Sequence, residues 1–198
     1  MKIDYKQESK LWATYFATIL IAMFVHEVGH CIPEWVHGYF AVPTLAKEYS
    51  SDFTPKDLNQ PIALGGILGS VFFTLTILLL YIIKKNRISS SVLAGAIAMP
   101  GLYSFMFFIK GRGHDGTEFQ DAQSVLGFSY SGHSIEWIFF TLFLVGSIAW
   151  YLKTKPGIRI IKRLLIGFVV TVIITSVLQD TNNAIFDPIF LTKSGIGK

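Results

Sequence analysis

Cysteine and charge are both scarce in this chain of 198 residues. The single cysteine, Cys31, excludes a disulfide bond within the chain, and with it a small scaffold held together by disulfides. Charged residues make up only 15% of the sequence, and no basic cluster is interleaved with aromatic side chains, which argues against a nucleic-acid partner. The sequence also lacks internal repeats and low-complexity tracts. We therefore expect one domain over residues 1–198.

The sequence is instead rich in long hydrophobic runs. Hydrophobic residues make up 52% of the chain and the mean hydropathy is +0.50, which is more apolar than a soluble domain of this length. A membrane-spanning helix needs about 20 apolar residues. Five stretches approach that length: 11–33, 62–83, 88–109, 135–152 and 160–179. The sequence therefore predicts an all-α, multi-pass integral membrane protein with about five transmembrane helices. The first helix is not expected to be a cleaved signal peptide, because it is long, lacks a small-residue cleavage site and contains the motif described below.

Basic residues indicate the orientation of these helices. Most of the 17 lysines and arginines fall in segments 1–10, 84–87 and 153–163, which five crossings would place on one side of the membrane. Because basic loops of membrane proteins are enriched on the cytoplasmic side, we expect a cytoplasmic N-terminus. Residues 34–60 and 111–133 would then lie on the opposite side.

The end of the first apolar stretch carries the sequence "HEVGH", residues 26 to 30, which has the pattern H-E-x-x-H. On a helix, positions i and i+4 share a face, so His26 and His30 could bind one metal ion. Zinc suits such a site, because it accepts three protein ligands and a water molecule. Glu27 would then accept a proton from that water. Ionisable residues at membrane depth are costly and usually functional, which favours a catalytic zinc site over a polar helix end.

A third ligand must come from another segment. Residues 111–123, "GRGHDGTEFQDAQ", follow the third apolar stretch and return to the side of the motif. Its candidate ligands are His114, Asp115, Glu118 and Asp121. Asp187, near the C-terminus, is a weaker candidate. The residue types alone leave the choice open.

The sequence around these motifs resembles the site-2 protease family of intramembrane zinc metalloproteases. "HEVGH" is separated by seven residues from Gly38, "YFAVPTL" stands where the family has an edge strand, and "ALGGILGSVFFTLTILLL" is similar to its second core helix. "HDG", residues 114 to 116, occupies the place of the family's "LDG" motif, and this resemblance implies that Asp115 is the third zinc ligand. It also implies a three-helix metalloprotease core within residues 11–125, followed by additional helices within 134–179.

A second resemblance gives the alternative. "TEFQDAQ" is similar to the "EFQAD"-like segment of the membrane zinc endopeptidases that process prenylated CAAX proteins, and it implies that Glu118 is the ligand. A membrane zinc hydrolase that cuts a lipid amide or ester would use the same ligands on another substrate.

The leading hypothesis is hydrolysis of a peptide bond in a membrane-protein substrate at the bilayer. Zinc would be held by His26, His30 and Asp115, and would lower the pKa of its bound water toward about 7. Glu27 would act as general base and then return the proton to the leaving amine. A transmembrane substrate must unwind before attack, because its backbone is otherwise held in internal hydrogen bonds. The segment "YFAVPTL" could pair with the unwound strand.

Overall fold

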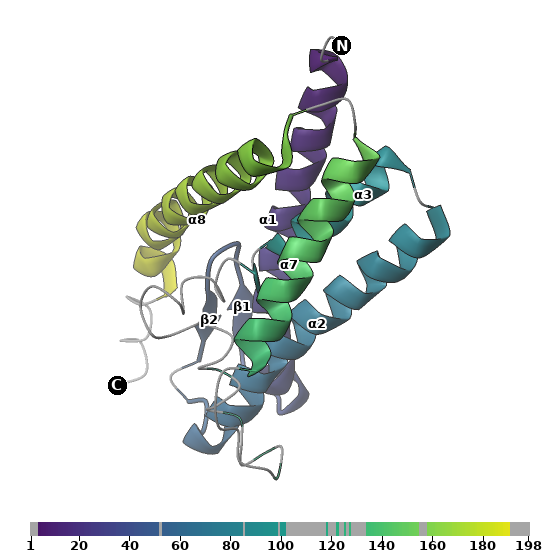
Figure 1. Ribbon diagram of the computed structural model, residues 1–198. Helices are drawn as coiled ribbons and strands as arrows, with labels where there is room; N and C mark the ends of the chain where they lie inside the picture. Colours follow the sequence, from purple (N-terminus) through teal and green to yellow (C-terminus); the bar gives the residue numbers. More distant parts are fainter. Residues whose placement is uncertain are drawn as a thin grey trace.

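The computed structural model describes residues 4–51, 53–84, 86–98, 100–101, 134–154 and 158–190, with the single residues Glu118, Ala122, Val125 and Gly127. These residues are mostly helical (Figure 1). The helices are α1 (Tyr5–Val36), α2 (Asn59–Lys84), α3 (Arg87–Ala96), α7 (Ser134–Lys153) and α8 (Ile160–Phe190), with a short 3-10 helix, η1 (Lys56–Leu58). The strands β1 (Ala41–Pro43) and β2 (Glu48–Ser50) form a small antiparallel sheet between α1 and α2 in the chain.

Four helical segments are long and apolar enough to cross a membrane: Tyr5–Val36, Lys56–Lys84, Glu136–Lys153 and Ile161–Phe190. They correspond to four of the five predicted stretches, and the helical part of the prediction is confirmed. The predicted third stretch, 88–109, is described only in its first part, where α3 has 10 residues. Residues 102–110 lie outside the described part of the chain, so a fifth crossing stays a prediction.

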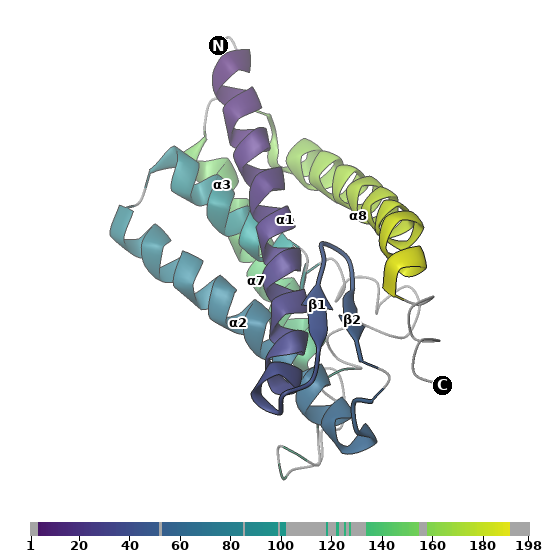
Figure 2. The same ribbon diagram turned by 180° about the vertical axis from the view of Figure 1, so that it is seen from behind.

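The ends of the helices match the charge pattern of the sequence. Figure 1 and Figure 2 show the start of α1 and the end of α7 toward one end of the molecule, with the hairpin in the other half. Lys153 is the last residue of α7 and therefore lies toward the same end as the start of α1. The H-E-x-x-H motif lies near the C-terminal end of α1, away from Tyr5, and the sidedness that the basic residues indicate stays a prediction.

Helix α1 begins and ends with recognisable capping interactions. The Asp4 carboxylate accepts hydrogen bonds from the backbone N–H groups of Lys6 and Gln7, both at 3.1 Å. At the other end Gly38, with φ of +80°, donates to the Trp35 carbonyl, and Tyr39 N–H donates to the Glu34 carbonyl at 2.9 Å. This pair of bonds is a Schellman motif, which needs a residue with positive φ and so favours glycine. The chain turns back at this point and leads directly into β1.

The predicted edge strand is confirmed, and it has a partner that the sequence did not predict. β1 pairs with β2 in the register Ala41 to Ser50, Val42 to Tyr49 and Pro43 to Glu48. Pro43 lacks a backbone N–H and is tolerated because both strands of a two-stranded sheet are edges. Successive side chains of a strand point to opposite faces, so Glu48 and Ser50 lie on one face of β2 and Tyr49 lies on the other.

Helices α1 and α2 approach each other through glycines. A Cβ atom on Gly29 or Gly65 would overlap the backbone carbonyl of the other, and one on Gly69 would lie 2.7 Å from the Val25 carbonyl. Small residues at such crossings let transmembrane helices pack backbone to backbone. A Cβ atom on Gly66 would overlap the His30 ring. The glycine-rich start of α2 therefore leaves the space that the second histidine occupies.

Candidate metal centre

The two histidines of the motif lie on one face of α1, as predicted, and both are buried. Their Nε2 atoms are 3.0 Å apart, and their rings meet nearly at right angles, with an interplanar angle of 87°. The Nε2 atoms therefore converge on one point.

Helix α2 orients both rings from the opposite side. Nδ1 of His26 lies 2.9 Å from Ser70 Oγ, and Nδ1 of His30 lies 2.7 Å from the Ile62 carbonyl oxygen. A carbonyl oxygen can only accept, so His30 Nδ1 carries a hydrogen, and in the neutral ring Nε2 keeps its lone pair. Hydrogen bonds of this kind fix the ring orientation of metal-binding histidines.

Glu118 completes a group of three possible ligands. Its carboxylate oxygens lie 3.3 Å from His30 Nε2 and 3.7 Å from His26 Nε2. Acceptor atoms that face one another repel unless a proton or a metal cation lies between them. Ligands about 2.0–2.1 Å from a tetrahedral zinc ion are about 3.3 Å from each other. The three separations, 3.0, 3.3 and 3.7 Å, bracket that value, so these residues fit a zinc ion.

The sequence offered four other candidate ligands. Asp115, His114 and Asp121 lie outside the described residues, so the assignment of Asp115 as third ligand stays a prediction. Asp187 is described, and its carboxylate contacts Lys47 and Tyr49. Of the described candidates, Glu118 alone is grouped with both histidines.

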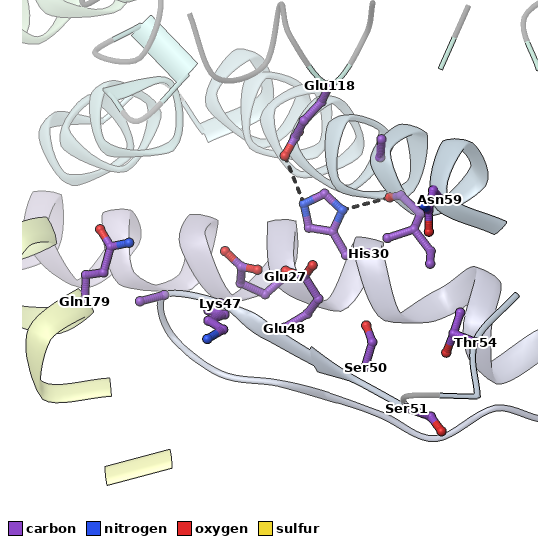
Figure 3. Close-up of a pocket in the computed structure, with 13 residues that line it drawn as sticks. Glu27, His30, Lys47, Glu48, Ser50, Ser51, Thr54, Asn59, Glu118 and Gln179 are labelled. Carbon is purple, nitrogen blue, oxygen red and sulfur yellow. Dashed lines mark hydrogen bonds and ion pairs between the residues drawn. The ribbon is translucent and has the colours of Figure 1, made fainter. Parts of the chain in front are cut away.

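Glu27 lines a cavity of about 540 Å³ beside His30 (Figure 3). A carboxylate oxygen of Glu27, one of Glu48 and a ring nitrogen of His30 all lie within 4.8 Å of one another. Glu27 is thus adjacent to the ligand group without belonging to the His26–His30–Glu118 set, which is the position that a general base requires. Polar and charged side chains form most of the cavity wall: Glu27, His30, Lys47, Glu48, Ser50, Ser51, Thr54, Asn59, Glu118 and Gln179.

A buried carboxylate on α1 holds the hairpin beside the cavity. Glu34 is completely buried, and it accepts hydrogen bonds from Ser50 Oγ at 2.9 Å and from Thr54 Oγ1 at 2.6 Å. Glu34 is one further helical turn from His30, on the same face. The face of β2 that carries Ser50 and Glu48 is therefore fixed against α1.

The other face of β2 is attached to α8. Tyr49 donates a hydrogen bond to Asp187 Oδ1 at 2.8 Å and accepts one from Asn182 Nδ2 at 3.2 Å, while Lys47 Nζ lies 3.0 Å from Asp187 Oδ1. Burial, reinforced by the neighbouring Asp187 carboxylate, raises the pKa of Tyr49 to about 12. The phenol is therefore protonated at physiological pH and acts as the donor in this contact.

Sequence reasoning missed the residues that orient the metal ligands and the hairpin. Ser70 and Gly66 belong to the stretch that the sequence related only to the second core helix of the site-2 protease family, while Glu48 and Glu34 are charged residues without a motif. The spacing of Glu34, four residues after His30 on the same helix face, was the one available signal. Glu48 has no comparable signal, because its position depends on the register of the hairpin.

Comparisons of the chain with protein-family models, with curated proteins and with solved structures gave no match. The functional argument therefore rests on the geometry of the site and on the motifs that it contains.

Proposed function

We propose that this chain is an intramembrane zinc metalloendopeptidase, similar to the site-2 proteases, that hydrolyses peptide bonds of membrane-spanning substrates. The observation that carries the proposal is the convergence of two histidine Nε2 atoms and one carboxylate at spacings that suit zinc, with Glu27 beside them. A site that only stored metal would not need a base in this place.

We assign one role to each residue of the proposed site. His26, His30 and one carboxylate, Asp115 or Glu118, would hold zinc. Bound zinc would polarise the scissile carbonyl and make a water molecule nucleophilic near neutral pH. Glu27 would accept the proton of the attacking water and deliver it to the leaving nitrogen.

The wall of the cavity favours a peptide over a lipid substrate. An unwound peptide carries N–H and C=O groups that need hydrogen-bond partners, and the cavity beside His30 offers hydroxyl, amide and carboxylate groups. Two apolar cavities, of about 590 and 510 Å³, lie elsewhere, and neither is lined by His26, Glu27 or His30. An enzyme for lipid amides or esters would instead need an apolar channel that reaches the metal.

The contact of Glu118 with both histidines supports a second candidate function. A glutamate ligand in "TEFQDAQ" is what the resemblance to the CAAX-type membrane endopeptidases implies. In that case the substrate would be the C-terminal segment of a prenylated protein.

A three-substrate assay with purified, zinc-loaded protein tests these alternatives. The substrates are a single-span peptide with a helix-destabilising residue near its end, a prenylated C-terminal peptide, and a lipid carrying an amide or ester. We expect cleavage of the single-span peptide, loss of cleavage after chelation and recovery after zinc is returned. Exclusive cleavage of the prenylated peptide would establish the CAAX-type function, and exclusive cleavage of the lipid would establish the lipid hydrolase.

A further inference from the structure

The hairpin brings a second carboxylate to the cavity, and the hydrolysis proposed above does not use it. Glu48 lies within 4.8 Å of both Glu27 and His30 and lines the same cavity (Figure 3). Its position is determined from both faces of β2, by the bond of Ser50 to Glu34 and by the bond of Tyr49 to Asp187. Glu48 is therefore held beside Glu27 by the fold.

Apart from the neighbouring His30, which is assigned to the metal, no basic side chain among the described residues faces this second carboxylate. The adjacent Lys47 contacts Asp187 at 3.0 Å, and within the described part of the chain no lysine or arginine pairs with Glu48. Two carboxylates so close together repel each other unless a proton or a cation lies between them. The pair therefore offers a place for one positively charged group.

We infer that Glu48 is a second catalytic carboxylate, which binds the leaving amine together with Glu27 as that nitrogen becomes an ammonium group. The inference rests on the proposed function. Two acceptors that each lie about 2.8–3.0 Å from one nitrogen can be up to about 6 Å apart, so both carboxylates can reach the same nitrogen. Hydrogen bonds between an ammonium and carboxylates are among the stronger ones in proteins.

The oxygen of the attacking water bonds to the scissile carbon while Glu27 takes one of its protons and passes it to the nitrogen. The C–N bond breaks and its electron pair stays on the nitrogen. The second proton of the former water reaches the same nitrogen through Glu27, so that one amide and one water give one carboxylate and one ammonium, without oxidation or reduction. Hydrolysis of an ester in the same site releases a neutral alcohol, which gives Glu48 no cation to bind.

A matched pair of substrates therefore isolates Glu48. Two single-span peptides would differ only at the scissile linkage, which is an amide in one and an ester in the other. We expect Glu48→Gln to lower kcat on the amide by about 10- to 100-fold, the value of a hydrogen bond to a charged group, and to leave kcat on the ester nearly unchanged. Glu27→Gln should impair both reactions. The matched control is Asp57→Asn, which removes an exposed carboxylate of η1 outside the cavity and should impair neither.

A binding measurement tests the same inference without turnover. A peptide that begins at the scissile position with a free amine should bind the zinc-loaded wild type more tightly than its acetylated form, and Glu48→Gln should reduce this preference. Zinc content should be unchanged in the variant.

Equal losses of kcat on amide and ester, no loss on either, or an undiminished preference for the free amine in Glu48→Gln would overturn the inference. A wild type that cleaves neither substrate would instead refute the proposed function, and the two peptide affinities would then decide the role of Glu48.

Discussion

Ser70 Oγ on α2 lies 2.9 Å from Nδ1 of His26 on α1, and it leaves Nε2 of that ring directed at His30. The two helices approach closely enough for this contact because glycines line their crossing. The packing of the helix pair and the geometry of the candidate metal centre are therefore one structural feature.

Removal of the Ser70 hydroxyl should weaken metal binding without unfolding the protein. Partners of metal-binding histidines typically contribute about 10- to 100-fold to metal affinity, and we expect a loss of that order in Ser70→Ala. Competition with a chromogenic zinc chelator measures the affinity. Thr76→Ala removes an exposed hydroxyl from the same helix and should bind zinc as the wild type does; an equal loss in both variants would contradict the role of Ser70.

Metal analysis of alanine variants should identify the third ligand. We expect about one zinc ion per chain in the wild type. The ion should be lost in His26→Ala and in His30→Ala, because each variant leaves only two of the three protein ligands that such a site needs. Loss of zinc in Asp115→Ala with retention in Glu118→Ala would support the site-2 protease resemblance. The reverse pattern would support the CAAX-type resemblance, and full zinc in both variants would exclude both residues as ligands.

The helix ends predict which segments share a side of the membrane. Cysteines introduced at Lys56, beside the hairpin, and at Lys153, at the end of α7, should react with an impermeant thiol reagent from opposite sides. The native Cys31 is fully buried and should give little background. Labelling of both positions from one side would contradict the predicted topology.

The contact between the hairpin and α8 should stabilise the fold less at strongly alkaline pH. The pKa of Tyr49, raised to about 12, exceeds the value of about 10 expected for an unfolded tyrosine, so the folded protein holds this proton more tightly. The resulting stabilisation is complete below pH 10 and is lost as the pH rises through 12. Thermal unfolding in detergent should show wild type more stable than Tyr49→Phe at pH 8, with the difference shrinking toward pH 12. A difference that stays constant over this range would refute the assignment.

The sequence predicted the parts of the structure that depend on local patterns. Apolar runs gave four helices that match the structure to within a few residues at most ends, although α8 continues to Phe190, well beyond the predicted residue 179. Helical spacing alone placed His26 and His30 on one face. The contributions of Ser70, Glu34 and Glu48 could not be predicted, because each depends on a pairing between segments far apart in the chain. A one-residue shift in the hairpin register would turn Glu48 away from the cavity and Tyr49 toward it.

The central claim is that Glu27 performs general-base catalysis beside a zinc ion, and cleavage of a single-span substrate by zinc-loaded Glu27→Gln tests it most directly. Glutamine keeps the size of the side chain but cannot accept a proton at neutral pH. We predict that the variant folds and binds zinc as the wild type does, while the rate of cleavage falls by about 10²- to 10⁴-fold or more. Equal cleavage by the two zinc-loaded proteins would contradict the account.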